Sequence, residues 1–271
     1  MGSHRRLLLN AAGTLLCMAV LFGAVAALAD SIKRFFYSVR VVTGTFAEAQ
    51  TYYAVTGAPA TLDEWMTKYN FPARLAGETL DAYRQRVGIV VYYNETELGL
   101  GRELGCSTFQ DVGPSGAAQP GLACFVTNYG ERFQDGDKAL IDAIDAKRRK
   151  NTVGISYAPS STPPPSGLGN GVVPAISAAV NFAVYGESGF RNNTSTLDMQ
   201  GHGPVPGICT NCHGGTYDAR DHLVIGGQFT PINPSILTFS SMAGYTLADQ
   251  EARIAALNTL MATVPRCGTS P

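Results

Sequence analysis

The stretch Gly88-Ile89-Val90-Val91-Tyr92-Tyr93 is dense in β-branched and aromatic side chains and predicts a buried β-strand. Residues 98–104 and 122–129 have a similar character and predict two more strands. The segment between them, residues 113–121, is rich in Gly, Ser, Pro and Gln and predicts a loop. Shorter strand-like stretches lie at residues 153–157 and 179–185.

Three helices are expected around these strands. A capping box formed by Thr61 and Glu64 opens a short helix that ends at Tyr69. Residues 137–150 predict a second helix, whose four final cations, Lys147 to Lys150, would interact favourably with the helix dipole. Its expected buried stripe is Ala139, Leu140, Ala143 and Ile144. A C-terminal amphipathic helix is expected after Thr246, over residues 247–263, and its apolar face would hold Leu247, Ile254, Leu257 and Met261.

These elements predict an α+β fold with three regions behind a signal peptide. The signal peptide is expected at residues 1–29, and a mixed α+β region at residues 30–158. A loop rich in Pro and Gly follows at residues 159–175. Residues 176–271 are expected to hold a small, irregular functional segment and the C-terminal helix, and this region forms either its own domain or one domain with residues 30–158.

The N-terminus indicates export. Arg5 and Arg6 precede a mostly apolar run, and Ala27-Leu28-Ala29 matches a small-x-small cleavage site that would leave Asp30 first. The alternative is an uncleaved anchor, because the apolar run is nearly long enough to span a bilayer. The expected location is therefore the periplasm or the extracellular medium, reached by general secretion.

The formal net charge of −1 argues against nucleic acid as a partner.

The cysteines agree with an oxidising compartment. Without Cys17, which lies in the expected signal peptide, five cysteines remain in the exported chain. Cys106 and Cys124 flank the predicted loop, so a disulfide between them is our first expectation. Either alternative pairing with Cys267 stays open at this point.

The motif with the clearest chemistry is Cys209-Thr210-Asn211-Cys212-His213. Cys-x-x-Cys-His is the attachment signature of a c-type haem. Two cysteines three residues apart on one helical turn reach the two vinyl groups of a porphyrin and form thioethers with them. The following histidine supplies the proximal imidazole to the iron. The sequence therefore predicts one covalent haem c on Cys209, Cys212 and His213.

Other uses of the two cysteines are less well supported. A zinc site would need a second ligand cluster, which the sequence does not contain. A redox dithiol would follow a strand and open a helix, and the Pro- and Gly-rich flanks of the motif do not indicate this pattern. A purely structural role for the pair is the third alternative.

The sixth ligand of the iron is open at this stage. Met242 precedes the last helix in a Gly-flanked turn, and His222 follows the motif closely enough for a loop to fold back over it. The further candidates are Met199, His202 and Met261. An open or water-filled sixth position is the remaining possibility.

Four segments of the chain carry a resemblance to a known family. They are residues 98–103, 123–129, 205–215 and 227–234, in this order, within Tyr92 to Phe239. This set resembles exported bacterial cytochrome c domain-containing proteins that have a single Cys-x-x-Cys-His haem motif. The resemblance implies haem binding through Cys209, Cys212 and His213, with electron transfer as the role. It implies neither a redox partner nor a sixth ligand.

The leading hypothesis is thus an exported monohaem electron carrier. One alternative is an enzyme or sensor with a five-coordinate haem, which would act on peroxide or bind a gas. Another is a structural exported protein in which the Cys-x-x-Cys pair has no chemical role. No catalytic residue is expected, because the sequence lacks hydrolase and phosphate-binding signatures. The redox partner protein is unknown, and contact with a membrane is expected only through an uncleaved signal.

Overall fold

The computed structural model describes residues 44–95, 98–112, 116–132, 134–159, 180–198 and 201–264. The expected signal peptide, nearly all of the expected Pro/Gly-rich loop, Met199 and Cys267 lie outside these residues. Within them, helices surround an antiparallel sheet, as the α+β prediction requires. No helix among them is long and apolar enough to cross a membrane.

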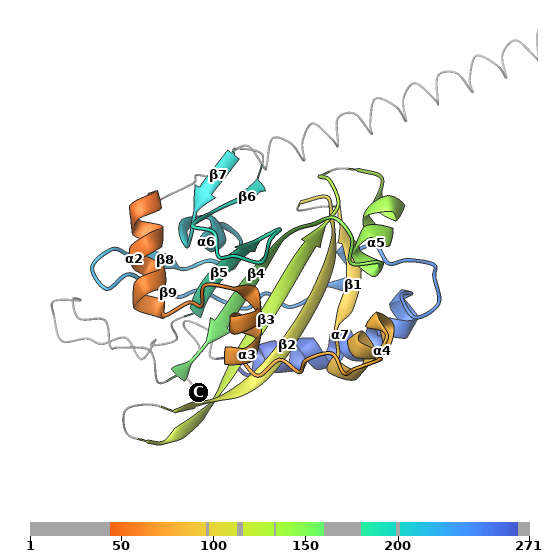
Figure 1. Ribbon diagram of the computed structural model, residues 1–271, viewed down its shortest axis with the longest axis horizontal. Coiled ribbons are helices and arrows are strands. Elements are labelled where there is room, and N and C mark those ends of the chain that lie inside the picture. The colour runs from red at the N-terminus through yellow and green to blue at the C-terminus, as the bar shows by residue number, and fades with distance from the viewer. Residues whose placement is uncertain are drawn as a thin grey trace, which may run out of the picture. The chain divides into compact units, whose positions relative to one another are not determined.

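The centre of the molecule is a five-stranded antiparallel meander (Figure 1). Its strands follow one another in chain order, so each pairs with the next along the sequence. The strands are β1 (Val90–Asn94), β2 (Leu100–Val112), β3 (Ala118–Tyr129), β4 (Arg149–Tyr157) and β5 (Val180–Gly186). All five strands contain or overlap a stretch in which the sequence predicted a strand.

The predicted loop at residues 113–121 is too long. The ladder between β2 and β3 continues out to the pair Val112 and Ala118, so the last four residues of that segment belong to a strand. A Cβ atom on Gly121 would lie 2.4 Å from Cζ of Phe109 on the neighbouring strand, so a larger residue there would force the phenyl ring to move. This glycine therefore lies in a strand and leaves room for the phenyl ring, although the composition of residues 113–121 indicated a loop.

Cys106 and Cys124 face each other directly across β2 and β3 and form a disulfide, as predicted. We expect their double replacement by alanine to lower the free energy of unfolding by about 2–4 kcal/mol, because the bond closes a short loop in the unfolded chain. Urea unfolding of the oxidised protein, the reduced protein and the double variant measures this. Equal stability of all three would contradict the expectation.

Five of the described helices pack around the sheet and its neighbouring strands. They are α2 (Phe46–Thr56), α3 (Leu62–Lys68), α4 (Leu80–Val87), α5 (Gly136–Ile144) and α7 (Leu247–Ala262). Helix α5 packs on β1 and β2, and Gly101 permits this approach, since a Cβ atom there would lie 2.0 Å from the carbonyl oxygen of Ala139. Helix α3 begins with the predicted capping box, and the indole of its Trp65 lies against Gly154 of β4.

The helix predicted over residues 137–150 ends early, at Ile144. Its apolar stripe is buried as expected. Ala146 and Arg148 adopt left-handed backbone conformations, which end the helix, and Arg149 begins β4. The prediction that the cations Lys147 to Lys150 occupy the last turn of the helix is therefore wrong. Instead, Arg148 reaches back to the carboxylate of Asp142, and Lys150 pairs with Glu131 at 2.6 Å.

Helix α7 begins after Thr246, whose side chain accepts a hydrogen bond from the backbone of Asp249. Ile254, Leu257 and Met261 are buried, whereas Leu247 is 40% exposed, so its place on the buried face was wrong. Gln250 is buried instead. Its side chain bonds the backbone N–H and C=O of Val91 on the edge strand β1 and thereby covers part of that edge.

At the β5 side of the molecule lie several short elements around the cysteine motif (Figure 1). A hairpin of β6 (Thr194–Asp198) and β7 (Gly201–Pro204) leads into α6 (Gly207–His213). A second hairpin, β8 (Thr216–Asp218) and β9 (Leu223–Ile225), follows, and β9 contacts β5. The 3-10 helix η2 (Pro234–Ile236) then leads toward α7.

Candidate functional site

The Cys-x-x-Cys-His motif occupies the last five residues of α6. One helical turn therefore carries both cysteines and the histidine, which is the local geometry that haem attachment requires. A short strand, β7, precedes this helix, so the strand-then-helix setting of a redox dithiol is present after all, contrary to what the flanking residues indicated. The environments of the two thiols help to distinguish haem attachment from a redox dithiol.

Cys209 and Cys212 lie in opposite environments. Cys209 is 2% exposed and belongs to the main hydrophobic core, which also contains Tyr52 and Tyr53. Burial, with a smaller contribution from the neighbouring Cys212, raises the pKa of the Cys209 thiol far above its ordinary value. Cys212 is exposed to solvent. A redox dithiol needs at least one thiol with a lowered pKa, and Cys209 does not provide it.

The two thiols are expected to react very differently with an alkylating reagent. In protein made without haem, iodoacetamide should modify Cys212 in the folded state and Cys209 only after denaturation, because a buried, protonated thiol is a poor nucleophile. Peptide mass spectrometry after brief labelling measures both sites. Equal labelling of the two cysteines in the folded protein would contradict the burial of Cys209.

His213 is held by the backbone of one residue, Gln228. The Nδ1 atom of His213 lies 2.9 Å from the carbonyl oxygen of Gln228, and the N–H of Gln228 donates to the carbonyl oxygen of His213, also at 2.9 Å. The imidazole ring packs against the ring of Phe182 on β5, with 5.3 Å between the ring centroids. An Nδ1–H bonded to a carbonyl selects the tautomer in which Nε2 carries the lone pair.

Glycines bring Gln228 to His213. Gly215 has a φ of 85° and lies so close to the chain at residues 225–227 that a Cβ atom on it would be 2.6 Å from the backbone nitrogen of Gly227. Gly226 also has a positive φ, 80°. Only residues without a side chain permit this crossing of two backbone segments. The Gly-Gly pair after the motif thus positions the histidine.

His222 and Met242, the two leading candidates for the sixth iron ligand, both lie in turns. His222 lies in the turn between β8 and β9, and its Nδ1 is 2.8 Å from the hydroxyl of Tyr217. The strand pairing places this turn at the far end of the hairpin from Gly214 and Gly215, which join it to α6. Met242 is 51% exposed in the turn before α7.

Among the other candidates, Met261 is buried in the core, and the side chain of His202 lies outside the described residues. The sixth ligand stays a prediction without a structural assignment.

A zinc site of the ordinary kind finds no support in the part of the chain that the structure describes. No group of three or more His, Cys, Asp or Glu side chains there is arranged to hold a metal ion.

Sequence reasoning found the three motif residues but missed their supports, Gln228 and Phe182. Gln228 acts through its backbone, which no side-chain pattern reveals. Comparison of the chain with family models, with curated proteins and with solved structures found no match.

Proposed function

We propose that the chain is an exported monohaem c-type cytochrome that carries its haem on Cys209, Cys212 and His213 and transfers single electrons. The observation that carries this proposal is the hydrogen bond from Nδ1 of His213 to the carbonyl of Gln228. In histidines that ligate metals, the N–H of the second ring nitrogen regularly donates a hydrogen bond to such a carbonyl. This bond orients the ring and makes it a better ligand. In this arrangement Nε2 is the nitrogen that would bind the iron.

The surroundings of the motif fit the group in two further respects. Cys209 lies among apolar and aromatic side chains, which would have to repack around the apolar edge of a porphyrin, whereas Cys212 lies at the surface. The Cys106–Cys124 disulfide is consistent with an oxidising compartment, where c-type haems are attached. A bound haem would supply the ferric–ferrous couple. The chain would hold the proximal imidazole in place.

The burial of Cys209 has a consequence for the order of assembly. A thiol that is 2% exposed cannot meet a haem vinyl group while the core around it is folded. Attachment therefore precedes folding of this region in the proposal, which agrees with transport of an unfolded chain by general secretion.

A five-coordinate haem is the second candidate, and the position of His222 favours it. This histidine is engaged by Tyr217 at the end of the β8–β9 hairpin, and Met242 faces solvent. A haem without a sixth protein ligand would bind peroxide or a gas, as in the enzyme and sensor alternatives.

The absorption spectrum tests both candidates. Protein coexpressed with haem-attachment machinery is reduced, and spectra are recorded before and after addition of carbon monoxide. A c-type ferrous spectrum that carbon monoxide leaves unchanged supports the six-coordinate electron carrier. A c-type spectrum that carbon monoxide shifts supports the five-coordinate enzyme or sensor. A spectrum without haem absorption would refute both.

A further inference from the structure

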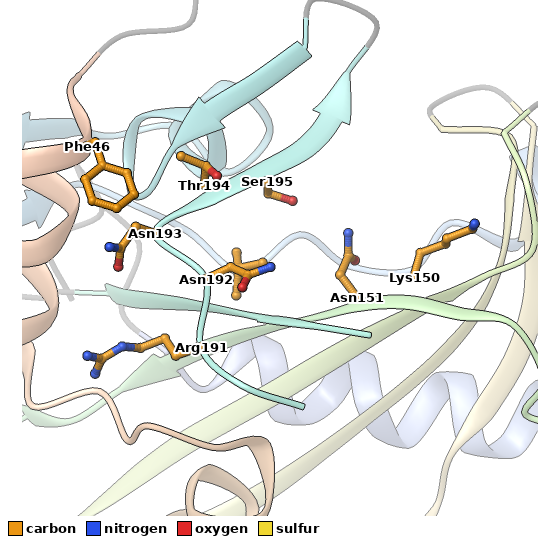
Figure 2. Close-up of a pocket in the computed structure, with 9 residues that line it drawn as sticks. Phe46, Lys150, Asn151, Arg191, Asn192, Asn193, Thr194 and Ser195 are labelled. Carbon is orange, nitrogen blue, oxygen red and sulfur yellow. The ribbon is translucent and has the colours of Figure 1, made fainter. Parts of the chain in front are cut away.

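A cavity of about 370 Å³ lies between the N-terminus of α2, the beginning of β4 and the segment that leads into β6 (Figure 2). Cavities of roughly 300–1,000 Å³ are typical of sites for small molecules. None of the motif residues lines this cavity, so it is independent of the proposed haem site. We call it the Asn151–Ser195 pocket, after two of its lining residues.

Ser195 is the most informative of these residues. It is 4% exposed, and its hydroxyl group is buried without a hydrogen-bond partner among the described residues. Buried polar atoms in proteins almost always have a partner, because an unsatisfied one costs free energy. Figure 2 shows this hydroxyl directed toward the side of the pocket where the amide nitrogen of Asn151 lies.

The polar lining is fixed in place before any ligand arrives. Oδ1 of Asn151 accepts a hydrogen bond from Asn128 at 2.7 Å, which turns the amide nitrogen of Asn151 toward the pocket. The backbone carbonyl of Asn192 accepts a hydrogen bond from the hydroxyl of Tyr53 at 2.8 Å. The backbone N–H of Asn192 donates to the carbonyl oxygen of Val184 at 2.7 Å. Such preorganisation reduces the entropy that a binding event would cost.

The charged groups at the pocket are already engaged. Lys150 is paired with Glu131 at 2.6 Å. The guanidinium group of Arg191 donates to the carbonyl of Ala58 and lies over the ring of Tyr53, 4.6 Å from its centroid. The groups that remain to meet a ligand are therefore mostly neutral amides and hydroxyls, which favours a neutral ligand with both donors and acceptors over an anion.

An aromatic side chain completes the site. Phe46, the first residue of α2, lines the pocket and is 57% exposed. A hydroxyl-rich ring presents polar groups around its edge and C–H groups on its face. It therefore matches amides and hydroxyls on one side and a phenyl ring on the other.

We propose that the Asn151–Ser195 pocket binds a neutral, hydroxyl-rich ligand of the size of one sugar unit, with a hydrogen bond to Ser195 and a ring face against Phe46. The proposal stands whether or not the chain carries haem.

The test is a binding titration of the full exported chain with glucose, galactose, mannose and N-acetylglucosamine at millimolar concentrations, by saturation-transfer NMR. At least one sugar is expected to bind saturably. Ser195→Ala should weaken its binding by roughly tenfold, the equivalent of one buried hydrogen bond. This variant should also fold at least as stably as the parent, because it removes an unsatisfied buried hydroxyl.

Two further variants make the test specific. Phe46→Ala replaces an exposed side chain, so it should weaken sugar binding without unfolding the protein. Ser235→Ala changes an exposed serine on η2, away from the pocket, and should leave binding unchanged. Absence of saturable binding by all four sugars would overturn the proposal. Binding of inorganic phosphate in their place would also overturn it, as would sugar binding that neither pocket variant weakens.

Discussion

Replacement of Arg84 by alanine is expected to lower the free energy of unfolding by about 3–5 kcal/mol, because it breaks a buried ion pair from one side. The Arg84 side chain is 1% exposed, and its partner, the Glu103 carboxylate, lies 2.6 Å away with its side chain 10% exposed. Without Arg84 the carboxylate would remain buried, and the hydrogen bond left to it among the described residues would be a long one, 3.4 Å, from the hydroxyl of Tyr129. An uncompensated buried charge is among the most costly changes in a protein core.

Arg84 also connects four separate segments of the chain. From α4 it reaches Glu103 on β2, and it donates to the carbonyl oxygens of Ala143 and Ile144 at the end of α5, each at 2.6 Å. It donates to the hydroxyl of Tyr245, shortly before α7, at 3.0 Å. The substitution therefore also leaves two carbonyl groups at the end of α5 without this donor.

Urea unfolding followed by circular dichroism measures the effect. Arg86→Ala is the matched control, since Arg86 lies on the same helix but its side chain is 34% exposed, so its loss should shift the midpoint less than the loss of Arg84. Arg84→Lys keeps the charge but lacks the planar group that bonds several acceptors together, and it should fall between the parent and Arg84→Ala. Equal midpoints for Arg84→Ala and Arg86→Ala would contradict the prediction.

The strands were predictable because their signals are local. Residues 88–93 combine β-branched and aromatic side chains, and the last four of them lie in β1, where every residue is buried. The extension of β2 and β3 was not predictable in the same way. It depends on the pairing of Val112 with Ala118 across the hairpin, and on the ring of Phe109 over Gly121, which are contacts between strands.

Two helices that the sequence analysis missed had recognisable ends. Thr45 and Glu48 form the same capping box before α2 that Thr61 and Glu64 form before α3. Helix α4 lies between an N-cap threonine and a left-handed glycine, Gly88. Their interiors gave little apolar periodicity, because Tyr52 and Tyr53 supply much of the buried surface of α2 and a buried arginine occupies the inner face of α4.

The candidate site also combines residues that the sequence identified with contacts that only the structure reveals. A contiguous motif identified Cys209, Cys212 and His213. The support of His213 comes from a backbone carbonyl fifteen residues away in sequence, and only the close crossing of Gly215 and Gly227 brings it there. The Asn151–Ser195 pocket was invisible to sequence reasoning, because its lining comes from α2, β4, β5 and the start of β6.

The second large effect concerns the cysteines of the motif. Double replacement Cys209→Ala/Cys212→Ala is expected to abolish covalent haem, because thioethers to these two sulfur atoms are the attachment that the proposal requires. His213 alone would hold haem only by coordination, which denaturation breaks. The matched control is Cys106→Ala/Cys124→Ala, which removes two other cysteines and the disulfide but keeps the motif.

The most direct test is therefore haem staining after denaturing electrophoresis, with protein coexpressed with haem-attachment machinery and the signal normalised to the amount of polypeptide. The account predicts a stained band for the parent and for Cys106→Ala/Cys124→Ala, and no staining for Cys209→Ala/Cys212→Ala. An unstained parent band, under conditions in which a control c-type cytochrome is stained, would contradict the account.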